Sequence, residues 1–247
     1  MWQALYAPGK RVVAQIAPAV RVAIGEEFGI PAGKNTIGKI FTALRMLGFD
    51  TVFDTSFSAD LTVIEEANEL LYKLKNGEQK YPLGNSLPLF TSCCPAWVRF
   101  VETKYPELLP YVSTCKSPME MFGAVLKEYY KPADEEAGME TVSVAVMPCV
   151  AKKHEAAREE FKRNEVPDVD YVITTKELIL MIKELGIQFD EIEPSAPDMP
   201  FSINSGAGVI FGVTGGVMEA ALRHVADKNN EALRELQYSG IRGLEGT

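Results

Sequence analysis

The four cysteines of this 247-residue chain are the side chains best suited to redox or metal chemistry. Cys93 and Cys94 are adjacent, and Cys149 stands alone further along the chain. Both Cys94 and Cys149 lie just after a β-rich run and just before a helix-forming segment. In α/β proteins ligands gather at the carboxyl ends of strands, where helix N-termini stabilise thiolates and anionic clusters. We therefore expect a redox or metal-cluster site around these residues.

Thiols in such a chain also have other common roles. A lone intracellular cysteine is commonly a small buried hydrophobe, and this is the preferred interpretation of Cys115. A disulfide between Cys93 and Cys94 would be strained, and it is not expected in reducing cytosol. Zinc is disfavoured because no C-x-x-C pair exists and His154 and His224 lie in charged, helical segments. An iron–sulfur cluster needs about four cysteine ligands, so spacing alone predicts an incomplete redox or cluster site.

The composition is that of a globular protein, with 47% hydrophobic and 24% charged residues. The net charge of -9 and the scattered basic residues make nucleic acid an unlikely partner. No apolar stretch approaches the roughly 18 residues of a membrane span. The N-terminus lacks a basic segment followed by an apolar run, so we expect a cytoplasmic protein.

Strand-like and helix-like segments alternate along the chain, which indicates an α/β fold with a mainly parallel sheet. Strands are predicted at 10–17, 50–55, 87–92, 141–148 and 170–175. Helices are predicted at 18–29, 36–48, 58–77, 95–105, 117–130, 150–163 and 176–186, and the glycine-rich run 206–227 passes from loop into helix. The segment 189–205 carries three prolines and is predicted to be a long loop.

Two cysteine-containing segments are similar to the first and second signature segments of the catalytic domain of [FeFe]-hydrogenases. These segments are FTSCCPAWVRF at 90–100 and MPCVAKKHEA at 147–156. The resemblance covers almost the whole chain, through 16–29, 38–50, 113–124, 168–187 and 205–223. It implies two lobes of mainly parallel β-sheet flanked by helices, with the active site in the cleft between them. We place lobe one at about 1–130 and lobe two at about 131–247.

The resemblance implies an oxidoreductase, a ferredoxin-type [FeFe]-hydrogenase that reversibly converts two protons and two electrons to H2. Its cofactor, the H-cluster, is a [4Fe-4S] cluster joined through a cysteine sulfur to a diiron unit. That unit carries CO, cyanide and a bridging dithiolate with a central amine. Carried over by position, Cys94 and Cys149 would ligate the [4Fe-4S] part, and Cys93 would relay protons between the amine and the protein.

The family's proton path corresponds to Glu66, Glu69 and Ser113. The two glutamates are three residues apart and therefore share one face of the helix predicted at 58–77. Without the resemblance, a solvated helix face is the ordinary interpretation of such glutamates. A thiol, a hydroxyl and carboxyl groups within hydrogen-bond reach of one another could pass a proton along.

Further positions correspond to residues around the diiron unit. Lys152 matches the lysine that hydrogen-bonds a cyanide ligand, although by itself it resembles a surface lysine. The apolar residues that match the lining of the diiron pocket, and that would otherwise be ordinary core, are Pro18, Met147 and Phe211. Ala19 and Met119 stand where many members have serine and glutamine. We therefore expect altered hydrogen bonds around the diiron unit.

The chain is expected to lack the family's third signature, a C-x-x-x-C segment with the remaining two cluster ligands. We therefore expect a further segment or chain that supplies these cysteines. A ferredoxin or a cluster-bearing subunit or domain would deliver electrons, and maturation proteins would build the cofactor. The alternative is a non-catalytic iron–sulfur assembly protein or H2 sensor on the same scaffold. Cys93 and the two glutamates favour the enzyme, because such a relative needs no proton relay.

Overall fold

The computed structural model describes residues 1–76, 87–213 and 215–228. The chain divides into two compact units, each built from two separate segments. We call residues 1–57 with 118–203 the sheet unit, and residues 58–117 with 204–247 the helical unit. This division differs from a single boundary near residue 130, because strand pairing joins segments that are far apart in the sequence.

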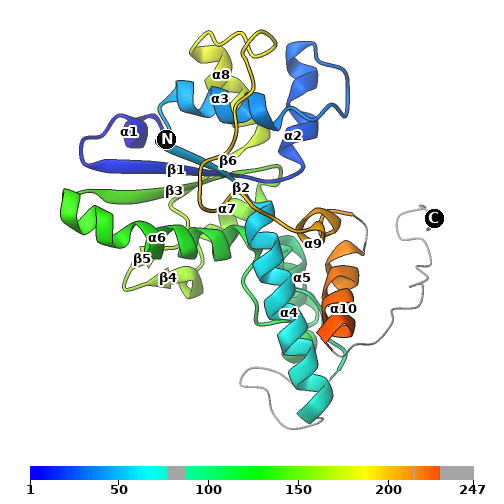
Figure 1. The fold of residues 1–247 in the computed structure, drawn as a ribbon. Coiled ribbons are helices and arrows are strands. Elements are labelled where there is room, and N and C mark those ends of the chain that lie inside the picture. Colours follow the sequence, from blue (N-terminus) through cyan, green and yellow to red (C-terminus); the bar gives the residue numbers. More distant parts are fainter. Residues whose placement is uncertain (77–86, 214, 229–247) are drawn as a thin grey trace. The chain divides into compact units, whose positions relative to one another are not determined.

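The sheet unit is built on four parallel strands in the order β2-β1-β3-β6 (Figure 1). Their bounds are Lys10–Ile16 for β1, Thr51–Asp54 for β2, Glu140–Met147 for β3 and Tyr171–Thr174 for β6. Four of the five predicted strands are thereby confirmed. The two central strands, β1 and β3, are almost entirely buried, as expected when helices cover both faces of a parallel sheet.

Helices cover both faces of this sheet (Figure 1). On one face lie α2 (Val20–Ala23), α3 (Ile37–Leu47) and α8 (Thr175–Glu184), which share a large apolar core with alternate residues of β1. On the other face, α6 (Pro118–Ala137) contributes Phe122 and Leu126, which pack with Val13 and Phe53. The α/β class predicted from the sequence is confirmed.

Two predicted helices are shorter than expected. The segment 18–29 forms α2 and the 3-10 helix η1 (Gly25–Phe28). The segment 150–163 forms α7 (Ala151–Ala156) and η3 (Glu159–Phe161), and then the small hairpin of β4 (Lys162–Arg163) and β5 (Val166–Pro167). The hairpin turn places Asn164 and Glu165 at positive φ, which helical periodicity cannot indicate. A short N-terminal helix, α1 (Trp2–Leu5), was not predicted.

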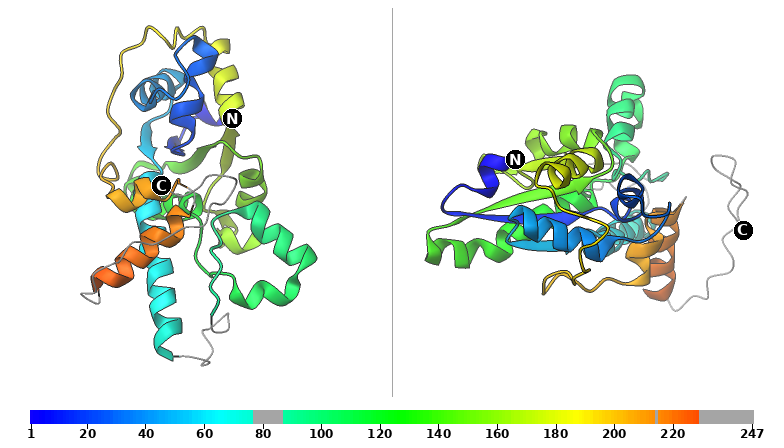
Figure 2. Two further views of the ribbon diagram at one scale, coloured as in Figure 1. Left: turned by 90° about the vertical axis from the view of Figure 1, so that its right-hand side faces the viewer. Right: turned by 90° about the horizontal axis from the view of Figure 1, so that it is seen from above.

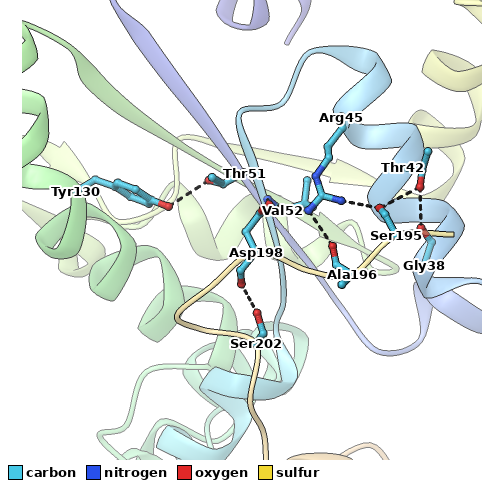
Figure 3. Close-up of polar contacts among 10 residues, drawn as sticks. All are labelled: Gly38, Thr42, Arg45, Thr51, Val52, Tyr130, Ser195, Ala196, Asp198 and Ser202. Atoms are coloured by element: carbon cyan, nitrogen blue, oxygen red, sulfur yellow. Dashed lines mark hydrogen bonds and ion pairs between the residues drawn. The ribbon is translucent and has the colours of Figure 1, made fainter.

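The segment 189–205 contains no helix or strand, as predicted, and it is fastened to the sheet unit (Figure 3). The Arg45 guanidinium on α3 donates to Ser195 Oγ at 2.6 Å, to the Ala196 carbonyl at 2.8 Å and to the Asp198 carboxylate at 2.8 Å. The same carboxylate accepts the amide of Val52 in β2 at 2.8 Å. These bonds hold residues 195–198 against α3 and β2 within the sheet unit.

The described part of the helical unit contains no regular strand. Its elements are most of α4 (Ser56–Asn76), α5 (Pro95–Lys104), the 3-10 helix η2 (Pro106–Tyr111), α9 (Gly206–Ile210) and α10 (Gly216–Lys228). The predicted strand at 87–92 is wrong, since this segment makes only an isolated parallel bridge from Phe90 to Val112. Gly77, the last residue of the helix predicted at 58–77, lies outside the described residues. No helix of the described ranges is long and apolar enough to cross a membrane.

Asp60 on α4 caps the start of α9. The ribbon of α9 lies beside that of α4 (Figure 2). Its carboxylate accepts the amide of Ser205 at 2.5 Å, the Ser205 hydroxyl at 2.7 Å and the amide of Gly208 at 2.7 Å. Asp60→Ala is therefore expected to lower the free energy of unfolding by about 1–2 kcal/mol. Urea denaturation would measure the loss. Asp60→Asn, which keeps one acceptor oxygen, should lose less, and equal losses for both variants would contradict the capping role.

Candidate functional site

The adjacent cysteines lie at the start of a helix in the helical unit. Cys94 is the N-cap residue of α5, with extended backbone, and Pro95 occupies the first turn. The Cys94 side chain is exposed, and Cys93 is partly buried. An exposed thiol at a helix N-terminus is well suited to be a metal-bound thiolate, because the helix dipole stabilises its negative charge.

Cys149 follows the carboxyl end of β3 in the sheet unit, and it is also an exposed free thiol. Lys152 lies in the first turn of α7 and donates to the Glu155 carboxylate at 2.6 Å. Met147, two residues before the thiol, is 3% exposed. Pro18 is partly buried, and the residue before it, Ala17, donates its amide to the Val146 carbonyl of β3 at 3.0 Å.

Cys94 in the helical unit and Cys149 in the sheet unit are each free thiols of the kind that can ligate an iron–sulfur cluster as thiolates. Cys94 and Cys149 are both exposed, and neither forms a disulfide. Within the described ranges, no three His, Cys, Asp or Glu side chains gather into a group that could hold a metal ion. Two thiols alone therefore cannot complete a cluster with four cysteine ligands. Phe211, the C-cap residue of α9, is partly buried in the helical unit.

Glu66 on α4 is a buried carboxyl group rather than part of a solvated face. It is 2% exposed, and neither carboxyl oxygen has a hydrogen bond of good geometry within the described residues. Burial raises the pKa of Glu66 to about 7, while a hydrogen bond from the backbone of Ser92 acts in the opposite direction and the charge of Glu69 adds to the rise. Such a group can take up and release a proton near neutral pH.

Glu66 and Cys94 line the same cavity of the helical unit. The cavity has a volume of about 940 Å³, and its other walls are mainly apolar side chains from α4, α5, α10 and the segment 87–91. The surroundings of the Glu66 carboxyl group are therefore poor in polar partners, which explains the direction of its pKa shift. Two residues singled out by the sequence are thus brought together by the fold.

Glu69, one helical turn further along α4, has the opposite environment. It is also 2% exposed, but its Oε2 accepts the Ser113 hydroxyl at 2.8 Å and the amide of Thr114 at 3.2 Å. Its Oε1 faces the Lys73 ammonium at 3.2 Å. The fold brings Glu69 and Ser113 into direct contact, as a proton path through them requires. The interpretation of both glutamates as a solvated face is wrong, because this face of α4 is covered.

Two neighbours of Glu69 in the structure were not predicted from the sequence. Lys73 is 3% exposed and lies four residues after Glu69, a spacing that places both on one helix face and could have been noticed. Cys115, interpreted as a small buried hydrophobe, has its sulfur 3.7 Å from Glu69 Oε2. Its only signal in the sequence was its position two residues after Ser113.

Solved structures of [FeFe]-hydrogenases have the same fold as this chain. One, from a study of how oxygen inactivates the H-cluster, has a TM-score of 0.82 and is 43% identical, covering 99% of this chain and 61% of the other. An apo [FeFe]-hydrogenase from Chlamydomonas reinhardtii has a TM-score of 0.80 and is 44% identical, covering 99% and 62%.

Curated relatives include both hydrogenases and assembly proteins. NADP-reducing hydrogenase subunit HndD of Solidesulfovibrio fructosivorans is 47% identical over 99% of this chain and 42% of its own length. Iron hydrogenase 1 of Clostridium pasteurianum is 47% identical over 98% of this chain and 41% of its own length. Protein NAR1 of Arabidopsis thaliana is 35% identical over 88% of this chain and 49% of its own length. The chain thus spans about two fifths of the length of these two hydrogenases.

The family comparison agrees with the cysteine segments and with the fold. Residues 10–247 match the family described as iron only hydrogenase large subunit, C-terminal domain. The match includes the vicinal cysteine pair, the second cysteine segment and both buried glutamates. This chain therefore belongs to the iron-only hydrogenase large subunit, C-terminal domain family.

Proposed function

We propose that this chain forms the H-cluster domain of an [FeFe]-hydrogenase that reversibly converts two protons and two electrons to H2. One observation carries the proposal: the buried Glu66 carboxyl group shares an apolar cavity with Cys94, directly beside Cys93 in sequence. A purely structural role gives no reason to bury an ionisable group in an apolar cavity, since that costs free energy. A proton path does.

Cys94 and Cys149 would supply two thiolates to the [4Fe-4S] part of the cofactor. When bound, the diiron unit with its CO, cyanide and bridging dithiolate supplies the centre at which H2 forms or is split. Lys152 would donate a hydrogen bond to a cyanide, and Pro18, Met147 and Phe211 would exclude water from the pocket. The remaining cluster ligands would come from a C-x-x-x-C segment or from another chain.

The chain's own residues would carry protons. Cys93 would pass a proton to Glu66, whose pKa of about 7 lets it change protonation near neutral pH. Ser113 would then connect this carboxyl group to Glu69, to which its hydroxyl already donates at 2.8 Å. Because Glu66 is only 2% exposed, its burial limits the access of other proton carriers and so favours a defined route.

We further propose a cytoplasmic protein that receives electrons from a ferredoxin or from a cluster-bearing subunit or domain. Maturation proteins would install the diiron unit. The hydrogenase relatives from Solidesulfovibrio fructosivorans and Clostridium pasteurianum are more than twice as long as this chain, so these partners concern the whole protein to which it belongs.

An iron–sulfur assembly protein is the second candidate, because relatives such as a cytosolic Fe-S cluster assembly factor of Danio rerio are 31% identical over 88% of this chain. Such a protein would hold a cluster without turning over H2. Cys93 and the buried pair of glutamates favour the enzyme. Measurement of H2 evolution by the reconstituted protein separates the two.

Iron and sulfide binding tests the cluster site directly. Reconstitution would be anaerobic, in the whole protein that supplies the C-x-x-x-C cysteines. We expect Cys94→Ala and Cys149→Ala each to lose the [4Fe-4S] absorbance and most of the iron, because a site left with three thiolates binds the cluster weakly. Cys115→Ala should retain both. Absence of iron and sulfide from the reconstituted wild-type protein would contradict the proposal.

A further inference from the structure

Cys115 lies in a short loop that is tied at both ends to the segments of the proposed site. Its carbonyl accepts the Ser92 hydroxyl at 2.6 Å, two residues before Cys94. Just before this loop, Phe90 and Val112 form the parallel bridge. The position of Cys115 is therefore set by the cysteine segment itself rather than by loose packing.

Two groups of Cys115 contact the hydrogen-bonded pair of Ser113 and Glu69. The backbone amide of Cys115 donates to Ser113 Oγ at 3.1 Å, and the sulfur lies 3.7 Å from Glu69 Oε2. A thiol within 4 Å of a carboxylate oxygen is at the distance of a sulfur hydrogen bond, longer than one from oxygen because sulfur is larger. Burial raises the pKa of Cys115 to about 12, while a side-chain hydrogen bond with Ser113 acts in the opposite direction, so the thiol keeps its proton and can donate it to the carboxylate, which only accepts.

These two contacts constrain the Ser113 hydroxyl. A hydroxyl has one proton and two lone pairs. The proton points to Glu69 Oε2 at 2.8 Å, and the Cys115 amide occupies one lone pair. This arrangement directs the hydroxyl proton of Ser113 towards Glu69.

The Glu69 carboxylate is constrained in the same way. Its Oε2 receives the Ser113 hydroxyl, the Thr114 amide and the Cys115 thiol, while Oε1 faces Lys73. Three donors on one oxygen fix the rotation of the carboxylate about its last bond. Without the thiol, fewer contacts hold Oε2 in line with Ser113.

We propose that Cys115 is a positioning residue of the proton path, whose thiol orients Glu69 and whose amide orients the Ser113 hydroxyl. The effect of Cys115 on turnover rests on the proposed function. The hydrogen bond between its thiol and Glu69 lies within this chain and does not depend on that function. The thiol transfers no proton. It holds donor and acceptor in the geometry that transfer requires.

Infrared spectroscopy of the S–H stretch tests the contact without any cofactor. The difference spectrum of wild-type chain minus Cys115→Ala isolates the Cys115 band from those of the other three cysteines. We expect a band lowered in frequency by hydrogen bonding to the carboxylate. In Glu69→Gln the same band should move to higher frequency, because a neutral amide is a weaker acceptor. A band at the same frequency in both proteins would overturn the proposal.

Turnover of the assembled enzyme tests the positioning role. Cys115→Ala should lower H2 turnover about fivefold, as expected from the loss of one hydrogen bond at the path, with unchanged iron content. Cys115→Ser keeps a donor of similar size and should restore the rate. Equal loss in both variants, or no loss in Cys115→Ala, would overturn the role. If wild-type protein has no turnover, the proposed function fails, and the S–H band still decides the contact.

Discussion

Cys93→Ser is expected to lower H2 turnover by about 10²–10⁴-fold while leaving the iron and sulfide content unchanged, which is the range that a positioned proton donor contributes. The substitution exchanges sulfur for oxygen at nearly constant shape. A serine hydroxyl is a much weaker acid than a thiol, so it passes a proton slowly between the cofactor and Glu66. Turnover would be measured as H2 evolution from a chemical reductant by the assembled enzyme.

Iron content is the control that separates a relay from a ligand. If Cys93 were a cluster ligand, Cys93→Ser would lose iron as Cys94→Ala does. If turnover were unchanged, protons would reach the cofactor by another route, and the relay role of Cys93 would be refuted. A loss of turnover with the cluster intact is the only result that fits the division of roles between the two adjacent cysteines.

Glu66→Gln should also lower turnover by about 10²–10⁴-fold, because the amide has the size of the carboxyl group but cannot take up a proton. Glu65→Gln is the matched control, since Glu65 precedes Glu66 on α4 and is exposed. It should retain the wild-type rate. Similar losses in both variants would indicate a general disturbance of α4 rather than interruption of a proton path.

The same variant makes a prediction about stability and pH. The pKa of Glu66 rises on folding from 4.5 to about 7, so between these values the folded chain binds more protons than the unfolded chain. Its contribution to stability is therefore complete below pH 4.5 and is lost as the pH rises towards and through about 7. This loss amounts to about 3 kcal/mol when the shift is converted to free energy.

Glu66→Gln has no such ionisation and should escape this loss. The free energy of unfolding of Glu66→Gln minus that of the wild-type chain should therefore be larger at pH 8 than at pH 5. Free energies of unfolding from urea titrations at the two pH values would measure the difference, with Glu65→Gln as control. A difference of the opposite sign, or none, would show that the carboxyl group is not held in a desolvating environment.

Much of the sheet unit could be predicted from the sequence because its signals are local. Continuous apolar runs such as 141–147 indicate strands buried on both faces, and the structure places β3 there. The prediction of one continuous helix at 150–163 was wrong because it also rested on local signals alone. The composition of this segment is typical of a helix, whereas tertiary contacts end α7 at Ala156 and form a hairpin that pairs Arg163 with Val166.

The predicted strand at 87–92 failed for a different reason. Strand formation depends on a neighbour with which to pair, and no property of the segment itself supplies one. In the described residues, Phe90 meets only a single bridging partner, Val112. An extended, apolar segment therefore stays irregular here, although its composition is that of a strand.

The sequence by itself determined the two cysteine segments, the alternation of strands and helices, and the resemblance to a family, because each depends on residue identity and order. Only the tertiary structure decided the environments of Glu66 and Glu69. Helical periodicity places both on one face of α4 but cannot show what covers that face. The fold surrounds Glu66 with apolar walls and Glu69 with donors from Ser113, Thr114 and Cys115, about 45 residues away in sequence. That difference arises from long-range packing, which sets desolvation and hydrogen bonding and hence how each carboxyl group handles a proton.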